Sequence, residues 1–527
     1  MSFPIIIGTR GSELALWQAN FTKNELAKHG IQAELKIIKT KGDATQQWNL
    51  SFDKIEGKGF FTKELEDALL ANEIDLAVHS CKDLPTTFPD GLTIAAYSKR
   101  ANPYDILLIK KESVDTTQLL KLKQNAIVGT SSARRKAQLK ALLPTITIND
   151  LRGNVPTRIK KLKEQDYDAI VLAAAGVERL NIDLSEFELV TLAAPMFIPA
   201  PAQGVLAFQI RNNDERLLEI CTLLNDKEST ALTTVERKIL NAFEGGCQMP
   251  LGVFAEKIKQ EIHIWVSQAT SFDTIPKRLH TVVNEVQNAE QLENTTAQIL
   301  GKLKEENPIS VFISSELPKD DYFLKVLEAH KYKVNYQSFM EFSSISFEYA
   351  DDADWLFFSS KNGVKYFFDC INTLSTKTKI AAINSGTAQA IMQLGFKVDF
   401  IGKGNNLQEI ATIFDKIANG KMVFIQAKVS MQSIQKVMVE NSNTHSLIVY
   451  ENKPKQDVAA REEEILVFTS PMNVEAYFSK NTLKENQKVI SIGNTTTAKL
   501  KELNILQVQT AFEPTKWSLL DEVFELS

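Results

Sequence analysis

Short apolar runs alternate with amphipathic helical stretches along the first 220 residues of the chain. The opening segment "PIIIGTRGSELALWQANFTKNELAKHG" predicts a strand, a turn that contains glycine, and then a helix. Three later segments repeat this order, and Ser132 and Asn154 are the expected N-caps of two of the helices. Such alternation indicates α/β layers whose strands run mostly parallel.

Polar side chains collect at the ends of these predicted strands, which is where α/β sheets bind their ligands. The set comprises Arg10, Ser12, Lys82, Asp83, Thr130, Ser132, Arg134, Arg135, Arg152, Arg158, Gly176 and Arg179. At Arg134, Arg135 and Arg158 a helix N-terminus adds backbone N–H donors and the positive end of a dipole. Each arginine alone suits an ordinary structural role, but together they predict a basic cleft that binds several carboxylates.

Two features of this cleft have both a functional and an ordinary interpretation. Asp83 either stabilises a cationic intermediate and moves a proton, or simply pairs with Lys82 in a turn. The segment "KIEGKGFFTKEL" contributes Lys54, Lys58 and Phe61, which either fold over a ligand or belong to a surface loop. This segment lacks the spacing of a phosphate-binding P-loop.

From about residue 220 to residue 305 the pattern changes to helix, loop, strand, hairpin and strand, which predicts a small α+β domain. The loop "EGGCQMPLG" places Cys247 between two glycines and a Met-Pro turn, unlike the apolar settings in which cysteine normally packs. The glycines let the backbone approach another group closely, and Pro250 ends any helix. Cys247 is either incidental to a helix C-cap or presented toward the cleft for chemistry.

A polar stretch at about residues 300–308 precedes a new predicted strand, and we place a domain boundary there. Beyond it the chain repeats itself. "LFFSSKNGVKYFF" corresponds to "LVFTSPMNVEAYF" at an offset of 110, and "IAAINSGTAQAIMQLG" corresponds to "VISIGNTTTAKLKELN" at an offset of 109. Each unit predicts a strand, a hydroxyl-bearing loop and a helix, so we expect two similar lobes that face each other. Their hydroxyl groups either cap helices or contact a ligand, and belong to Ser359, Ser360, Thr387, Thr469, Ser470, Thr495 and Thr496.

The composition limits the class of protein. Of 527 residues, 44% are hydrophobic and 24% charged, which suits several ordinary cores, and the net charge of -5 gives no reason to expect nucleic acid as a partner. The four cysteines lie far apart without metal-ligand spacing, so we expect no disulfide framework, no metal site and a cytoplasmic location. We also expect neither a signal peptide nor a membrane span.

Arginine is distributed unevenly along the chain. Ten of the twelve arginines precede residue 250, and only Arg278 and Arg461 follow it, although lysine is common throughout. The guanidinium group is a rigid fork that binds a carboxylate or a phosphate with two hydrogen bonds. The first half of the chain is therefore the half that we expect to bind an anionic ligand.

Eight ordered motifs in residues 4–305 resemble the hydroxymethylbilane synthase family, also called porphobilinogen deaminase. They are "GTRGSELALWQA", "EGKGFFTKELEDALL", "AVHSCKDLP", "VGTSSARRKAQL", "LRGNVPTR", "LAAAGVERL", "PAPAQGVLAFQIR" and "EGGCQMPLG". The second half resembles uroporphyrinogen-III synthases through "SSKNGV", "VYENKP", "FTSPMNVEAY" and "IGNTTTAKL". Together the resemblances imply a bifunctional fusion of two consecutive steps of haem biosynthesis, a transferase followed by a lyase.

The first resemblance implies two periplasmic-binding-protein-like α/β domains, residues 1–100 with 196–219 and residues 101–195, and a cysteine-bearing α+β domain at residues 220–305. The second implies a two-lobed α/β module at residues 306–527, with one lobe at 306–342 and 453–527 and the other at 343–452. The implied partners are small molecules, porphobilinogen and hydroxymethylbilane, and we expect a monomer.

In the synthase family the loop cysteine carries a dipyrromethane cofactor through a thioether, and Cys247 matches that residue. Four porphobilinogen units add to this primer, each with loss of ammonia, before hydrolysis releases hydroxymethylbilane. Asp83 matches the catalytic acid of the family, with Lys82 beside it. The implied cofactor contacts are Ser80, Lys82, Asp83, Thr130, Ser132, Arg134, Arg135, Arg158 and Gln203. The implied substrate contacts are Arg10, Ser12, Arg152, Arg158, Gly176, Arg179 and, in a loop over the site, Lys54, Lys58 and Phe61.

For the second half the resemblance implies loss of the terminal hydroxyl, inversion of the last ring and cyclisation to uroporphyrinogen III, without a metal or an added cofactor. Tyr450 matches a tyrosine implicated in ring closure, and the implied substrate contacts are Ser359, Ser360, Thr469, Ser470, Thr495 and Thr496. Asn384 stands where the family often has glycine, and the segment from Asn419 lacks the usual arginine-and-glycine pattern. Two alternatives therefore stay open: an active synthase with a degenerate C-terminal module, and a carboxylate-binding protein without catalysis.

Overall fold

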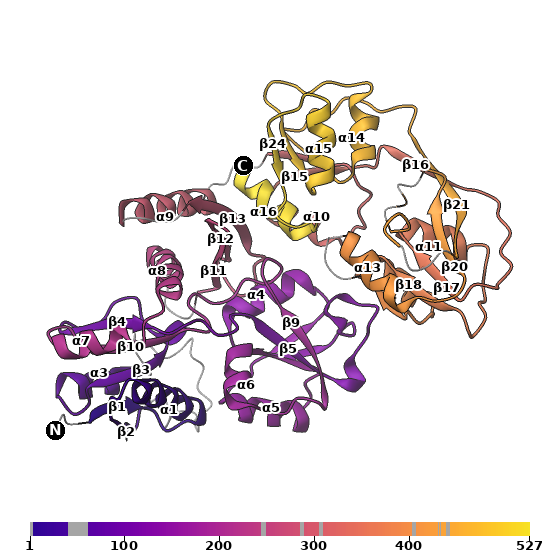
Figure 1. Ribbon diagram of the computed structural model, residues 1–527. Coiled ribbons are helices and arrows are strands. Elements are labelled where there is room, and N and C mark those ends of the chain that lie inside the picture. Colours follow the sequence, from indigo (N-terminus) through magenta and orange to yellow (C-terminus); the bar gives the residue numbers. More distant parts are fainter. Residues whose placement is uncertain are drawn as a thin grey trace.

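The computed structural model describes residues 4–40, 62–243, 249–284, 289–304, 309–402, 407–429, 432, 434–438 and 443–527. Within these residues the strands form five sheets. Three sheets belong to residues 4–304 and two to residues 309–527, which we call the first and second modules. Figure 1 shows the first module in indigo to magenta and the second in orange to yellow. In the described ranges no helix combines the length and the apolar content needed to cross a membrane.

The first sheet contains the N-terminal strand and has the order β2-β1-β3-β10-β4. Its strands are β1 (Ile5–Thr9), β2 (Ala33–Ile37), β3 (Leu76–Ser80), β4 (Leu92–Tyr97) and β10 (Leu206–Arg211). The helices that accompany it are α1 (Glu13–Lys28), α3 (Lys63–Leu70) and α7 (Glu215–Thr222). The Oγ atom of Ser12 accepts a hydrogen bond from the Ala15 N–H and begins α1, so the predicted strand, turn and helix are confirmed.

The second sheet has the order β7-β6-β8-β5-β9. Its strands are β5 (Asp105–Lys110), β6 (Ile127–Gly129), β7 (Thr147–Asn149), β8 (Ala169–Ala173) and β9 (Phe187–Leu192), and its helices are α4 (Ala133–Leu142), α5 (Val155–Glu164) and α6 (Ala174–Leu180). The predicted N-caps are confirmed, because Ser132 accepts from the N–H of Arg135 and Asn154 accepts from the N–H of Thr157. Each cap satisfies a donor that the first turn of its helix leaves without an intrahelical partner.

The expectation of mostly parallel strands is confirmed for these two sheets, because four of the five described strands in each run in the same direction and one is reversed. In each of them two pairings are parallel and two are antiparallel. The chain leaves the first sheet after β4, completes the second sheet, and returns after β9 as β10. Strand β10 therefore lies antiparallel between β3 and β4, and β5 lies antiparallel between β8 and β9. Strand direction follows from this double crossing rather than from the local pattern.

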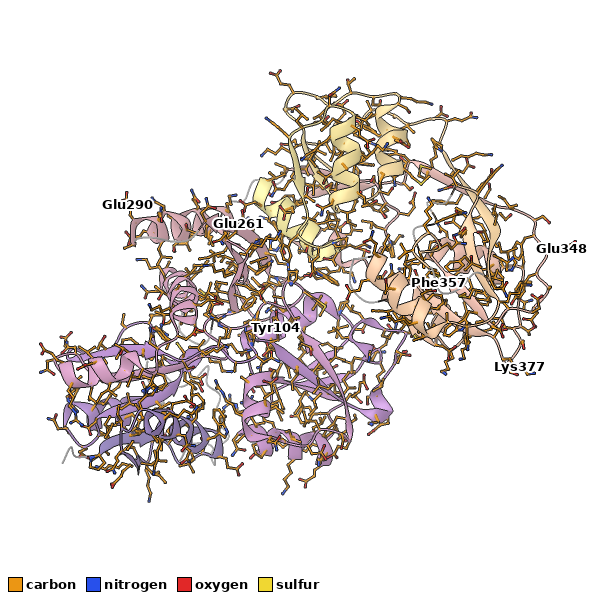
Figure 2. The ribbon with its side chains drawn as sticks, viewed as in Figure 1. Tyr104, Glu261, Glu290, Glu348, Phe357 and Lys377 are labelled. Atoms are coloured by element: carbon orange, nitrogen blue, oxygen red, sulfur yellow. The ribbon has the colours of Figure 1, made fainter. Side chains whose placement is uncertain are left out.

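The third sheet is an antiparallel meander of β11 (Leu251–Ile258), β12 (Glu261–Gln268) and β13 (Lys277–Asn284). The helices α8 (Lys227–Ala242) and α9 (Ala289–Lys304) cover it. Figure 2 shows Tyr104 between this sheet and the second one, and its ring lies 5.8 Å from that of Phe254 on β11. The predicted change to an α+β arrangement is confirmed.

The fourth sheet is parallel throughout and has the order β15-β14-β22-β23-β24. Its strands are β14 (Ser310–Ile313), β15 (Lys333–Tyr336), β22 (Ile465–Phe468), β23 (Lys488–Ser491) and β24 (Val508–Thr510). The helices around it are α10 (Tyr322–Ala329), α14 (Pro471–Phe478), α15 (Asn494–Glu502) and α16 (Lys516–Leu526). It therefore combines the beginning and the end of the second module.

The fifth sheet has the order β16-β21-β20-β17-β18-β19. Its strands are β16 (Met340–Ser344), β17 (Trp355–Phe358), β18 (Lys379–Ala382), β19 (Phe400–Ile401), β20 (Met422–Ala427) and β21 (Thr444–Pro454). Its helices are α11 (Lys361–Phe368), α12 (Ser385–Gln393) and α13 (Leu407–Ile417). The antiparallel pair of β16 and β21 carries the chain from the fourth sheet to the fifth and back, and Figure 1 shows it between the two lobes.

The predicted internal repeat is confirmed. Strand β17 and helix α11 correspond to β22 and α14 at an offset of 110, and β18 and α12 correspond to β23 and α15 at an offset of 109. Each of these four units consists of a strand, a turn and a helix, and its strand belongs to the sheet of its own lobe. The two lobes therefore share one local plan although their sequences differ.

Candidate functional site

The carboxyl end of β3 separates a buried thiol from two charged side chains. The strand ends at Ser80 and continues directly into a 3-10 turn at Cys81–Asp83. Cys81 is fully buried, and burial raises the pKa of its thiol to about 12, so it cannot act as a nucleophile. Lys82 is half-buried and Asp83 is exposed at the protein surface. The turn therefore presents the ammonium and carboxylate groups rather than the sulfur.

A cavity lies at the carboxyl ends of β1 and β3. Four residues that the sequence analysis took from separate motifs line it together, Arg10, Ser12, Ser80 and Asp83. Gln18 of α1 lines the same cavity and donates from Nε2 to the Ser80 Oγ atom at 2.8 Å. The predicted gathering of polar side chains at strand ends is thus present in the first sheet.

Positive charge exceeds negative charge at the centre of the cleft. Among the described residues that interact there, the cations are Lys82, Arg134, Arg135 and Arg158 and the carboxylates are Asp83 and Asp105. Desolvation, reinforced by the charge of Arg135, lowers the pKa of Lys82 to about 8 and that of Arg158 to about 10. Both shifts mean that burial and the neighbouring arginine disfavour the charged forms of these two side chains.

Arg134 and Arg135 begin α4 and share the carboxylate of Asp105. Arg134 Nη1 lies 2.9 Å from Oδ2 and Arg135 Nη2 lies 2.6 Å from Oδ1. Burial favours protonation of Asp105, but the two guanidinium charges outweigh it and hold the pKa of the carboxyl well below its usual value. In the described structure the Nε–H groups of both arginines are buried without a hydrogen-bond partner. The Nε–H groups of Arg100 and Arg461 are in the same condition, so it is not specific to this cluster.

Gln203 connects the two halves of the cleft. It lies in the crossover from β9 to β10, and its Oε1 atom accepts a hydrogen bond from Lys82 Nζ at 3.2 Å. Its Nε2 atom donates to the Pro103 carbonyl at 2.7 Å and to Asp105 Oδ1 at 3.1 Å. The Gln203 amide therefore links Lys82, which follows β3 of the first sheet, to Asp105 of the second sheet.

The turns before α4 and α5 contain the remaining predicted residues of the second sheet. Thr130 is buried, and its Oγ1 atom accepts from the Ser132 N–H at 3.3 Å. Arg158 lies in the first turn of α5 and donates from Nε to the Gly153 carbonyl at 2.7 Å. Arg152 is half-buried in the loop before α5. The structure thus brings Arg158 into the central cluster and places Arg152 in the loop beside it.

Helix α6 packs against α1 across the cleft. The guanidinium of Arg179 lies over the Trp17 ring at 5.5 Å from its centroid and donates to the Gly204 carbonyl at 2.8 Å. Burial lowers the pKa of Arg179 to about 10. Gly176 faces Val155 and Leu14, where an added Cβ atom would make only ordinary van der Waals contact. This contact joins the two sheets on the side of the predicted site.

Four predicted residues lie outside the described residues, namely Lys54, Lys58, Phe61 and Cys247. The described chain reaches Phe243 before the cysteine-containing loop and resumes at Met249. Both flanking side chains pack against the apolar core of the third sheet. The assignment of these four residues therefore stays a prediction.

In the second module Tyr450 contacts the first turn of α11. Its hydroxyl lies 3.0 Å from the Ser360 Oγ atom, and its ring stacks on Tyr366 at a centroid distance of 5.5 Å. Burial raises the pKa of Tyr450. Ser360 is also the N-cap of α11 and accepts from the Gly363 N–H at 3.0 Å. The capping interpretation of this hydroxyl is confirmed.

The repeat also places hydroxyl groups in matching roles. Ser359 donates to the Ile425 carbonyl at 3.3 Å, and Thr469, 110 residues later, donates to the Ser314 carbonyl at 2.7 Å. Ser470 caps α14 as Ser360 caps α11. Thr495 is exposed, whereas Thr387 and Thr496 are buried. Asn384, which stands where the family often has glycine, caps α12 by accepting from the Thr387 N–H at 2.9 Å.

Sequence analysis missed two buried acids. Asp105 begins a strand whose next four residues are apolar, and it is the counter-charge of Arg134 and Arg135. Glu236 is fully buried on α8 and forms two hydrogen bonds with the guanidinium of Arg100, at 2.8 and 3.0 Å. A detectable signal was present in both cases, because each acid lies within an apolar strand or on the apolar face of a helix, where charge is rare unless paired.

Family comparisons cover most of the chain. Residues 5–219 match the family described as "Porphobilinogen deaminase, dipyromethane cofactor binding domain", and residues 230–303 match "Porphobilinogen deaminase, C-terminal domain". Residues 324–521 match "Uroporphyrinogen-III synthase HemD". The three matches follow one another in the order of the described sheets.

Individual relatives agree with this division. The porphobilinogen deaminase of Sulfurimonas denitrificans is 46% identical over 254 residues, which are 48% of this chain and 79% of that protein. The porphobilinogen deaminase of Chlorobium luteolum is 40% identical over 305 residues, which are 58% of this chain and 95% of that protein. A crystal structure of uroporphyrinogen-III synthetase from Helicobacter pylori is 22% identical, with a TM-score of 0.34, and the match covers 42% of this chain and 100% of that chain.

Proposed function

The chain belongs to the porphobilinogen deaminase family and continues into a uroporphyrinogen-III synthase segment, and on this premise we propose that it carries out two consecutive reactions. The first joins four porphobilinogen units to hydroxymethylbilane. The second closes that product to uroporphyrinogen III with inversion of its last ring. The first module thus acts as a transferase and the second as a lyase.

One observation carries the first assignment, namely the surplus of desolvated positive charge in the cleft. The described cluster places four cations against two carboxylates, and the pKa values of Lys82 and Arg158 are lowered first by burial and then by the charge of Arg135. Each pyrrole of a growing chain brings an acetate and a propionate. A polycarboxylate would neutralise the surplus through charge-assisted hydrogen bonds.

The residues that would hold the dipyrromethane cofactor suit its chemistry. When bound through a thioether to Cys247, the group supplies the pyrrole terminus to which porphobilinogen is added. We assign its side-chain carboxylates to Ser80, Lys82, Thr130, Ser132, Arg134, Arg135, Arg158 and Gln203. The excess of cations over carboxylates around Asp105 supports this assignment, because the side chains of the cofactor are carboxylates.

We assign the incoming porphobilinogen to the cavity at the ends of β1 and β3. Arg10 and Ser12 line it and would bind the acetate and propionate groups, with Arg152, Arg179, Gly176 and the segment of Lys54, Lys58 and Phe61 around them. Asp83 lines the same cavity, and Lys82 is its neighbour in the chain. The Asp83 carboxylate would accept pyrrole N–H groups, stabilise the cationic methylene left when ammonia departs, and assist removal of the proton lost when the new C–C bond forms.

We place the second reaction between the two lobes of the second module. Tyr450 would assist departure of the terminal hydroxyl, since its own hydroxyl lies against Ser360 at a strand end. Ser359, Ser360, Thr469, Ser470, Thr495 and Thr496 would bind the polar groups of hydroxymethylbilane. The support for this assignment is that the repeat positions two of these hydroxyl groups at helix N-termini, where anions are favoured.

We propose the domain organisation on the same grounds. Residues 1–100 with 196–219, residues 101–195 and residues 220–305 would form the three domains of the first module, the first two like periplasmic binding proteins. Residues 306–342 with 453–527 and residues 343–452 would form the two lobes. We further propose a monomer that acts in the cytoplasm on small molecules.

A non-catalytic second module is the alternative that one observation favours. Arg461, the one arginine of the sequence after residue 305, lies over the Phe312 ring at 4.3 Å and donates to Gln337. Its guanidinium is therefore engaged within the first lobe. In this alternative the chain would still make hydroxymethylbilane, which closes without the enzyme to the type I ring.

The mass of the intact purified chain tests the first assignment. We expect the mass of the polypeptide plus one dipyrromethane, because the thioether survives denaturation. Cys247→Ser should have the mass of the bare polypeptide and no deaminase activity, whereas Cys370→Ser, which changes an exposed cysteine of the second module, should retain both. A wild-type chain without the added mass contradicts the proposal.

A further inference from the structure

The last helix of the second module packs against the third sheet of the first. Helix α16 lies along β13, and Figure 1 shows it in yellow between the sheet and the upper lobe. In Figure 2 the end of β12 at Glu261 lies beside this helix. The ring of Phe512 stands 5.3 Å from Trp265 and 5.4 Å from His280. The two modules therefore share a packed interface as well as a polypeptide linker.

A buried ion pair crosses this interface. Arg278 of β13 and Asp521 of α16 are each 1% exposed. Arg278 Nε lies 2.9 Å from Asp521 Oδ1, and Arg278 Nη2 lies 3.2 Å from Oδ2. A buried pair of this kind is a weak source of net stability, because desolvating both charges offsets their attraction. Its geometry, in contrast, fixes the guanidinium in one orientation.

The same guanidinium binds the crossover between the first two sheets. Nη1 donates to the Met196 carbonyl at 3.2 Å and Nη2 donates to the Pro195 carbonyl. Residues 193–205 form the crossover, since β9 ends at Leu192 and β10 begins at Leu206. One arginine thus joins the third sheet, the crossover and the C-terminal helix.

The crossover in turn positions the site. Two residues beyond Met196, the Ile198 carbonyl accepts from Arg134 Nη1 at 2.9 Å and from Gln138 Nε2 at 2.9 Å. The same carbonyl lies 2.7 Å from the point where a Cβ atom on Gly252 would stand, so β11 passes the crossover at the closest approach that glycine allows. Gly252 lies five residues after Cys247. A contiguous set of contacts therefore runs from Asp521 to Arg134 and to the strand that follows the cysteine.

We propose that Arg278 and Asp521 are positioning residues for the deaminase reaction, and that the second module supplies one of them. The proposal rests on the function assigned to the first module. Asp521 orients the Arg278 fork, the fork holds the Pro195 and Met196 carbonyls, and the held crossover orients Arg134 toward the substrate carboxylates. The second module would then carry its own active site and would also help to orient Arg134 in the active site of the first module.

The test uses the full chain and a double substitution, Arg278→Met with Asp521→Leu. Replacing both members of a buried ion pair by apolar residues of similar size often preserves stability, so the variant should fold. It should nevertheless raise the KM for porphobilinogen about tenfold or more, since a small displacement of a binding group is costly. The covalent intermediates seen by intact mass should also accumulate at shorter chain lengths than in the wild type.

Two further variants make every outcome informative. Glu525→Gln removes the more exposed Lys302–Glu525 pair of the same helix and should leave KM unchanged. Asp521→Asn keeps the shape of the side chain but removes its charge. It should raise the KM for porphobilinogen even if the double variant is not obtained as folded protein. Because KM does not depend on the fraction of active chains, a variant that only loses stability keeps the wild-type value, and that result overturns the inference. A wild-type chain without deaminase activity would instead overturn the proposed function.

Discussion

Lys82 shows how the cleft is prepared for anions. Its ammonium is desolvated, it donates a hydrogen bond to the neutral Gln203 amide, and it interacts electrostatically with Asp83 and Asp105. Burial lowers its pKa to about 8, so the cation predominates only below that pH. A bound carboxylate would raise the pKa again, since opposite charge favours the protonated form. Binding and protonation of this residue are therefore coupled.

The pH dependence of substrate binding follows from this coupling. We expect the KM for porphobilinogen to rise as the pH increases above about 8, because Lys82 loses its charge there, at a pH that the carboxylates of the bound cofactor move upward. Lys82→Arg should flatten this rise, since guanidinium stays charged across the range. Between pH 8 and the ordinary lysine value of 10.5 the folded chain binds fewer protons than the unfolded one, so this group makes the free energy of unfolding increase with pH. A wild-type KM that stays constant from pH 7 up to the ordinary lysine value of 10.5 would contradict the assignment.

Tyr450 and Tyr366 separate a chemical role from a packing role. Both rings belong to one stacked pair, but only the Tyr450 hydroxyl lies against Ser360, whereas the Tyr366 hydroxyl donates to the Phe342 carbonyl. We expect Tyr450→Phe to reduce the share of the type III isomer among the products. Tyr366→Phe is the matched control and should keep the wild-type isomer ratio. Equal ratios for the two variants, as measured by chromatography of the products, would remove Tyr450 from the mechanism.

The residues that the sequence revealed and those it concealed differ in one physical respect. Arg134, Arg135 and Arg158 follow strands and begin helices, so local pattern alone locates them. Asp105 and Glu236 act through partners more than twenty residues away, Arg134 and Arg100 respectively. Local periodicity records that an acid lies on an apolar face but not which cation neutralises it.

At the scale of elements, local signals were sufficient for caps and repeats. Ser132, Asn154, Ser360 and Ser470 cap the helices that the sequence placed after them. The direction of β10 was not predictable, because it depends on a crossover that leaves one sheet and returns through another. Helix boundaries follow from nearest neighbours in the chain, whereas strand direction follows from the path of the whole domain.

Helix α8 connects the third sheet to the crossovers through Glu236. Its carboxylate binds the Arg100 guanidinium and also accepts from the N–H groups of Ala202 and Ala255, at 2.6 and 2.7 Å. Glu236→Gln leaves the Arg100 guanidinium without its buried counter-charge and should lower the free energy of unfolding of the first module by about 3–5 kcal/mol. Glu293→Gln is the control. It removes the exposed partner of Lys238, which lies on α8 like Glu236, and should leave the free energy of unfolding unchanged. Denaturant unfolding compares the two, and equal stabilities would contradict this role.

At the scale of the whole molecule, charge is divided between the modules as their proposed tasks require. The first module concentrates arginine around a cleft that must retain a growing polyanion through several additions. The second module contains little arginine and presents hydroxyl groups and helix N-termini, which suffice for a substrate that is bound once and released. The buried Arg278–Asp521 pair joins the two at one interface.

The isomer of the macrocycle made from porphobilinogen by the single purified chain tests the central claim most directly. With no other protein present, chromatography of the oxidised products should show the type III isomer in large excess. Type I alone would mean that the second module does not act on the product of the first, and the absence of any macrocycle would mean that the cleft does not polymerise porphobilinogen. Either of these two results contradicts the account of one chain that performs both reactions.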